Sequence, residues 1–148
     1  MPIVYPYIQY GGVWTLQQQM QAQGAANWPN QPMPGLYSWG QNNRGQLGLG
    51  NTTYYSSPKQ VGALTTWSKV ACGQDYTIAI KTDGTLWSWG YNYNGALGNS
   101  VSTGNVLSPV QTIALGTNWK FVAPSAGIKT DGTLWVWGTN SYGQLGDN

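Results

Sequence analysis

The hydrophobic and polar positions of residues 67–110 alternate with a period of two, which is typical of β-strands. Three apolar runs rich in β-branched and aromatic residues are followed by a loop of Asn and Gly and a last extended piece. Between the second and third runs lies Asp83-Gly84, a strong signal for a hairpin turn. Predicted strands cover residues 67–72, 76–80, 86–89 and a stretch near Pro109. This is the pattern of one four-stranded propeller blade, and no helical period competes with it.

The third strand and the loop after it occur three times along the chain. The phrase Leu-x-x-Trp-Gly-x4-Gly-x-Leu-Gly begins at Leu36, Leu86 and Leu134, so its Trp recurs after 50 and then 48 positions. A fixed period of this size predicts stacked modules that cover one another's hydrophobic faces. We therefore expect an all-β repeat domain over residues 35–148, with units at 36–61, 67–113 and 119–148. The side chains expected to form its core are Trp39, Trp89, Trp137, Leu47, Leu97 and Leu145.

These repeats resemble the regulator-of-chromosome-condensation repeat. Residues 71–73 (Ala-Cys-Gly) and 77–80 (Thr-Ile-Ala-Ile) match that pattern, although Tyr76 stands where the family has His. The third unit departs further, because residues 119–129 are four fewer than residues 67–81, which predicts a clipped second strand. The resemblance implies β-propeller blades of four antiparallel strands, and it says little about function because the family's roles are diverse.

Members of that family usually close a ring of about seven blades, whereas this chain carries about two and a third. An open stack leaves unpaired strand edges, so we expect something to complete it. The chain is either a piece of a longer protein or a subunit that identical copies complete. We favour a homo-oligomer, with a trimer as the expected state.

The composition describes a neutral, aromatic chain. Charged residues are 7% and aromatic residues 14%, there is no His, and the net charge is +2. The positive side chains form no run, so we expect no nucleic-acid partner. Cys72 is the single cysteine and is expected to be a small buried hydrophobe. No secretion signal is evident, and no apolar stretch is long enough for insertion into a membrane.

Residues 1–34 lie outside the repeat and predict an extended arm, a short helix and a Pro-rich linker. The helix is expected to begin at a capping box that starts with Thr15. A helix this short is only marginally stable by itself, so we expect it to dock on another component. The alternative is that it is a simple N-terminal addition to the first blade. The expected docking residues are Trp14, Leu16, Met20 and Trp28.

Residues 11–19 and 26–29 also resemble a segment that precedes variable repeat domains in virion structural proteins of tailed bacteriophages, especially marine ones. This resemblance implies a tail, fibre or capsid-surface protein with a role in host attachment. Its partners would be other virion proteins, which the N-terminal arm would contact. Its location would be the virion, assembled in the host cytoplasm.

Candidate catalytic groups are few. His and Glu are absent, and Asp83 and Asp131 lie in Asp-Gly turns, where the carboxylate bonds to nearby backbone. Asp75 and Asp147 are loop residues without a partner at useful spacing. We therefore expect no enzyme activity, no cofactor and no metal site.

A binding role remains open. Four Tyr residues fall in loops that differ between the repeats, interleaved with amide and hydroxyl side chains that suit stacking on sugars. Host surface glycans are one candidate ligand, and packing against a neighbouring blade or chain is the alternative role for these rings. They are Tyr54, Tyr55, Tyr91 and Tyr93.

Two main functions follow. The first is a non-enzymatic virion structural protein that self-associates through incomplete blades. The second is a protein-binding propeller, similar to regulators of small GTPases or chromatin, or to a propeller that inhibits an enzyme. The oligomeric state would distinguish them.

Overall fold

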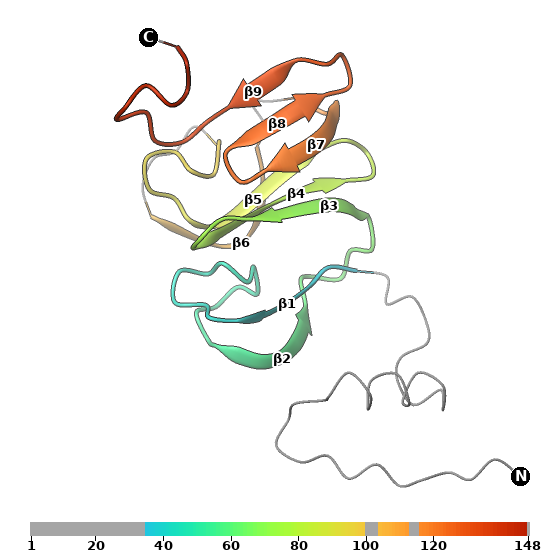
Figure 1. Cartoon of the computed structure of the whole chain (residues 1–148). Helices are drawn as coiled ribbons and strands as arrows, with labels where there is room; N and C mark the ends of the chain where they lie inside the picture. Colours follow the sequence, from blue (N-terminus) through green and yellow to red (C-terminus); the bar gives the residue numbers. More distant parts are fainter. Residues whose placement is uncertain (1–34, 100–103, 113–115, 148) are drawn as a thin grey trace, which may run out of the picture. The chain divides into compact units, whose positions relative to one another are not determined.

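The computed structural model describes residues 35–99, 104–112 and 116–147, and these residues form three antiparallel sheets (Figure 1). We call the sheets blades 1, 2 and 3; they have two, four and three strands. In each blade, strands that are consecutive in sequence are neighbours in the sheet. The all-β fold with propeller blades, predicted from the sequence, is thus confirmed. Blade 1 consists of β1 (Tyr37–Gly40) and β2 (Tyr55–Gln60), blade 2 of β3 (Trp67–Cys72), β4 (Tyr76–Lys81), β5 (Leu86–Tyr91) and β6 (Asn105–Gln111), and blade 3 of β7 (Trp119–Ala123), β8 (Ala126–Lys129) and β9 (Leu134–Val136).

The Asp-Gly turn between β4 and β5 forms as expected. The Asp83 carboxylate accepts hydrogen bonds from the Thr85 amide at 2.9 Å and from the Thr85 hydroxyl at 2.6 Å. Gly84 follows with φ +77°, a backbone conformation that L side chains rarely adopt. The same geometry recurs between β8 and β9, where Asp131 accepts from Thr133 at 2.9 and 2.7 Å. Two identical local sequences therefore fold into two identical turns.

Hydrophobic side chains pack between successive blades. Strands β3 and β4 of blade 2 contact strand β7 of blade 3. The core of this interface contains Ile78, Ile80, Leu86, Trp119, Val122 and Trp137. A second buried cluster, between blades 1 and 2, contains Val61, Ala79 and Trp89. Each sheet thus covers one face of the next, as in stacked modules.

The six expected core residues have different environments. Leu97 is fully buried, Trp89 is 1% exposed, and Leu47 and Trp137 are also buried, whereas Leu145 is half-buried. Trp39 departs from the expectation, because 59% of its surface is exposed. Within the described residues no sheet precedes blade 1, whereas blade 1 precedes blade 2 and helps to bury Trp89. Repeat position alone therefore does not determine burial.

Cys72 also departs from the expectation, since it is exposed. It lies on the face of β3 that is directed toward blade 1, where Val70 is 50% exposed. Blade 1 has two described strands, and they leave this part of β3 uncovered.

The clipped second strand of the third unit is confirmed. The strand β8 has four residues, whereas its counterpart β4 has six. Ala71 pairs with Ile78 in blade 2, and the equivalent pair in blade 3 is Ala123 with Ala126. Six residues separate the partners in blade 2 and two in blade 3, so residues 73–76 have no counterpart in blade 3.

The predicted arm, helix and linker, with the docking residues Trp14, Leu16, Met20 and Trp28, lie outside the described residues. The division at residue 34 into two domains stays a prediction. Over residues 35–99, 104–112 and 116–147, no helix has the length and apolar character needed to cross a membrane.

Candidate functional site

Three loops with different sequences sit at equivalent places on the repeated scaffold. Each follows the Trp-Gly pair of its repeat: residues 41–44 are Gln-Asn-Asn-Arg, residues 91–94 are Tyr-Asn-Tyr-Asn, and residues 139–142 are Thr-Asn-Ser-Tyr. We call these three segments the loop row. Only the second residue, an Asn, is the same in all three. Variation on a constant scaffold is typical of a binding surface.

The shared Asn holds each loop in one shape. The Asn42 side-chain oxygen accepts from the Leu47 amide at 3.0 Å, and its nitrogen donates to the Asn51 carbonyl at 2.9 Å. Asn92 makes the equivalent bond to the Leu97 amide at 3.2 Å. Asn42 and Asn92 are completely buried. Buried amides with their bonds satisfied stabilise one loop conformation.

The same arrangement recurs in the last loop of the row. Asn140 accepts from the Leu145 amide at 3.0 Å and donates to the Asp147 carboxylate at 2.7 Å. These Asn residues were not predicted from the sequence, although their recurrence at one repeat position was a visible signal.

Adjacent loops of the row contact one another. The Arg44 guanidinium carbon lies 4.6 Å from the centre of the Tyr91 ring, a cation–π contact. Tyr91 and Tyr93 stack with ring centres 5.8 Å apart and an angle of 6° between their planes. On the other side, the Asn94 amide donates to the Thr139 hydroxyl at 3.2 Å. The three loops therefore form a continuous surface of aromatic and polar groups.

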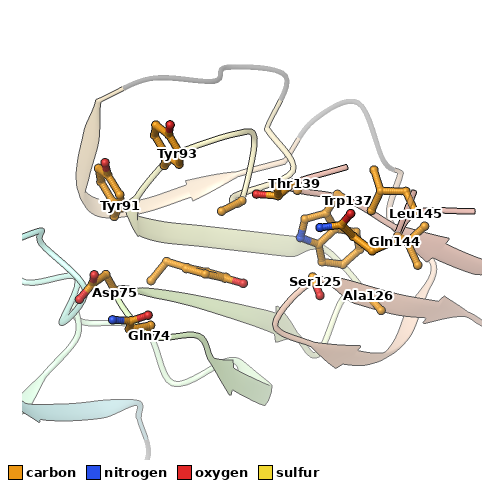
Figure 2. A pocket seen from close by; sticks show the side chains of 14 residues that line it. Gln74, Asp75, Tyr91, Tyr93, Ser125, Ala126, Trp137, Thr139, Gln144 and Leu145 are labelled. Carbon is orange, nitrogen blue, oxygen red and sulfur yellow. The ribbon is translucent and has the colours of Figure 1, made fainter. Parts of the chain in front are cut away.

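A pocket of about 500 Å³ opens between blades 2 and 3 beside the loop row (Figure 2). Blade 2 contributes Asp75, Tyr91 and Tyr93, and blade 3 contributes Trp137 and Thr139. Asp75 is the one charged side chain among the pocket's lining residues. The pocket thus combines aromatic faces, hydrogen-bonding groups and a single negative charge.

The structure separates the four Tyr residues selected from the sequence. Tyr91 and Tyr93 lie together at the pocket, whereas Tyr54 and Tyr55 belong to blade 1 and do not line it. Tyr54 is 60% exposed. The Tyr55 hydroxyl accepts a hydrogen bond from Asn51 at 3.2 Å, which fixes that ring locally. Only the first pair therefore contributes to this site.

The acidic side chains of the turns are occupied in structural roles. Hydrogen bonds from Thr85 hold the pKa of the Asp83 carboxyl below its ordinary value, and Thr133 does the same to the pKa of Asp131. Among the residues that the structure describes, no three side chains of the His, Cys, Asp or Glu type gather as metal ligands would. What the loop row and the pocket offer is stacking and hydrogen bonding, which suits recognition of a ligand.

A repeated contact between Lys and Trp side chains was also not predicted from the sequence. The Lys81 ammonium lies 3.3 Å from the centre of the Trp87 ring and 5.0 Å from that of Trp67. Lys129 lies 4.0 Å from Trp135 and 5.2 Å from Trp119. These contacts stabilise the turn end of blades 2 and 3. The signal was the repeated Lys-Thr-Asp-Gly-Thr-Leu-Trp segment, which contains Trp87 or Trp135. The other Trp of each arrangement, Trp67 or Trp119, lies outside that segment.

Family models for the regulator of chromosome condensation (RCC1) repeat match residues 35–80 and 83–129, and a second model of the same description matches residues 67–96 and 125–144. A protein RCC2 homologue of Danio rerio is 42% identical over 76 residues, which are 50% of this chain and 15% of that protein. The chain thus spans a small part of the length of this relative.

Solved structures show the same fold. Human WBSCR16 is 27% identical with a TM-score of 0.63, over 72% of this chain and 29% of that one. Prp20p of Saccharomyces cerevisiae, whose structure was described together with its binding to Gsp1p and histones, is 20% identical with a TM-score of 0.66, over 74% and 30% of the two chains. At that identity the likeness to Prp20p establishes the fold alone.

The virion interpretation of the sequence is wrong. The relatives with which the repeats align include RCC2 proteins of vertebrates, and the matching structures include propellers of human and yeast proteins. These findings overturn the expected bacteriophage tail or capsid function, its location in the virion and its role in host attachment. They also overturn the expected partners among other virion proteins and host glycans, whereas the expected trimer stays a prediction. The resemblance of the N-terminal segment to phage proteins was too short to establish a function.

Proposed function

Because the chain belongs to the regulator of chromosome condensation (RCC1) repeat family, we propose that it works as a protein-binding propeller module. It acts by contact with its partner and without enzymatic chemistry of its own. The partner is a protein of the kind that such regulators recognise, a small GTPase or a chromatin protein.

The observation that carries this proposal is the loop row. Arg44, Tyr91 and Tyr93 stack in series on a surface that differs between otherwise similar repeats. Arg and Tyr are enriched among the residues that dominate the energetics of protein interfaces. The buried Asn42 and Asn92 hold the loops in shape before any partner arrives, so little conformational entropy is lost on binding.

The loop row also has the chemistry for an acidic or polar partner surface. One face of the Tyr91 ring is covered by the Arg44 guanidinium, which keeps donors free for a partner's carboxylate or phosphate. Tyr93 is 61% exposed and offers a flat apolar face beside it. Asp75 lies on the pocket side of the same surface and would accept a basic group.

Biolayer interferometry with the full chain tests this proposal. Immobilised protein is exposed to purified Gsp1p and to purified histones, because both are named for the structural neighbour Prp20p. Binding of one of them is expected to weaken about tenfold or more in Arg44→Ala and in Tyr93→Ala, the size of an interface hot spot. Lys69→Ala removes the same charge from an exposed position on β3 and should leave the affinity unchanged.

Two results would contradict the proposal. One is the absence of binding to either protein at about 100 µM, which is weaker than a regulatory contact needs. The other is binding that Arg44→Ala, Tyr93→Ala and Lys69→Ala affect equally, because the loop row would then not be the contact surface.

A further inference from the structure

Blade 2 carries four residues that blade 3 lacks, residues 73–76 at the tip of the β3–β4 hairpin. In blade 2 this tip lies directly over Gly90. A Cβ on Gly90 would be 2.5 Å from the Asp75 carbonyl oxygen and 2.6 Å from the Tyr76 Cα. The Asp75 carbonyl also accepts a hydrogen bond from the Tyr91 amide at 2.8 Å. The tip thus fills the space beside the Trp-Gly pair and satisfies the amide that follows it.

The equivalent place in blade 3 is open. Gly138 has φ +101°, close to the +103° of Gly90, so the backbone has the same course. The nearest atom that a Cβ on Gly138 would meet is the Ala96 Cα at 3.9 Å. Thr139 corresponds to Tyr91, and its amide has no acceptor among the described residues. The pocket of about 500 Å³ lies here, with Gly138 and Thr139 in its lining.

A buried donor at the same pocket also lacks a partner. In blade 2 the Trp89 indole N–H donates to the Gln46 carbonyl at 3.0 Å. Its counterpart Trp137 is 8% exposed, and its indole nitrogen is buried without a hydrogen bond. Figure 2 shows this nitrogen on the side of the ring directed into the pocket. Trp67, Ser88 and Trp119 also carry a buried polar atom without a hydrogen bond, but Trp137 is the one of the four that lines this pocket, where a bound group could supply the acceptor.

We propose that this pocket binds a short extended peptide segment of a partner protein, whose backbone takes the place that residues 73–76 occupy in blade 2. A peptide carbonyl accepts from the Thr139 amide, as the Asp75 carbonyl accepts from Tyr91. This is recognition by addition of backbone to a free strand end. The inference rests on the proposed function as a protein-binding module, and it specifies what that module recognises.

The occupant is a polypeptide because the repeat itself shows which group fits this space. Blade 2 fills the equivalent position with its own main chain, at a matching glycine and beside a matching Trp. The lining also indicates the side chains that the segment carries. Asp75 is the one charged group, so neutral or basic side chains fit better than acidic ones. Tyr91 and Tyr93 supply an aromatic wall for an apolar or planar side chain.

The test is a titration of the ¹⁵N-labelled full chain with the neutral peptide acetyl-Gly-Gln-Asn-Tyr-amide, followed by two-dimensional NMR. The Thr139 amide and the Trp137 indole N–H are expected to shift together and to saturate with a Kd on the order of 1 mM, typical of so small a ligand. The acidic analogue acetyl-Gly-Glu-Asp-Tyr-amide should bind several-fold more weakly because of Asp75.

Three variants show whether the backbone site is used. Thr139→Pro removes the amide donor and should weaken peptide binding about tenfold or more, whereas Thr139→Ser keeps both the amide donor and the hydroxyl that accepts from Asn94 and should weaken binding far less. Insertion of Gly-Gln-Asp-Tyr between Pro124 and Ser125 rebuilds the missing tip and should abolish binding. If the inserted chain does not fold, the Thr139 pair still decides.

Shifts that spare Thr139 and Trp137, no saturation at about 10 mM, or equal binding by Thr139→Pro and Thr139→Ser would each overturn the inference. Its failure is distinguishable from failure of the proposed function. If Gsp1p or histones bind in a way that depends on Arg44 and Tyr93, but no peptide binds at Thr139, the inferred peptide site is wrong and the proposed protein-binding function stands.

Discussion

Alanine at the last glycine of each repeat should destabilise the protein to three different degrees. Gly48, Gly98 and Gly146 have φ values of +71°, +61° and +72°, so all three substitutions place an L side chain in the left-handed region. That backbone cost is about 1–2 kcal/mol and is common to the three. The differences come from the space that the new Cβ meets.

At Gly48 a Cβ would be 2.6 Å from the Trp89 indole nitrogen and 2.9 Å from two further ring atoms. The ring is rigid and 1% exposed, so it cannot move without losing its hydrogen bond to Gln46. Overpacking of this kind adds about 1–3 kcal/mol, for a total of about 2–5 kcal/mol. At Gly98 the nearest Trp137 atom is 3.3 Å away, so the added cost is a few tenths of a kcal/mol.

At Gly146 no described atom lies within 4 Å, so only the backbone cost remains. Urea unfolding followed by Trp fluorescence measures the three differences. As a control, Gly48→Ala in a Trp89→Ala background should cost only the common backbone term, because the clashing ring is gone. Equal destabilisation at all three positions, or a cost at Gly48 that persists without Trp89, would refute the reasoning.

Further predictions concern burial and pH. Trp89→Ala is expected to lower the free energy of unfolding by about 3–5 kcal/mol in the same urea assay. Trp39→Ala changes the same repeat position, but that side chain is 59% exposed, so the loss should be under about 1 kcal/mol. Similar losses for the two variants would contradict this expectation. Because bonds from Thr85 lower the pKa of Asp83 in the folded state, the stability of that turn is present above about pH 4 and is lost as the pH falls through the folded pKa. Asp83→Asn should therefore flatten the decline of Tm in acid, and an unchanged decline would count against the role of that carboxylate.

Much of the fold could be predicted because its signals are local. The alternation over residues 76–80, the Asp83-Gly84 pair and the Trp-Gly phrase each specify a strand or a turn within a few residues. The three sheets follow from repetition of these signals. Function was harder to predict, because the short phage-like segment and the repeat indicated different classes of protein. The comparisons support the repeat.

The candidate site was only partly predictable. The loop that contains Tyr91 and Tyr93 could be selected because it varies between repeats. The sequence around Tyr54 is also rich in Tyr, Asn and Thr, but Tyr54 does not line the pocket. Stacking of Arg44 on Tyr91 joins two repeats, and no local pattern encodes such a contact. The sequence showed that the third unit lacks four residues, but it did not show that their absence leaves a pocket beside Trp137.

The sequence by itself determined which segments become strands, where the hairpins turn and that the units repeat, because backbone preferences and side-chain alternation act between near neighbours. Only the tertiary structure decided which copy of a repeated residue is buried. Trp39 and Trp89 occupy the same place in the phrase, yet one is exposed and the other is enclosed. The physical reason is that burial depends on the neighbouring blade, and that blade comes from a distant part of the chain.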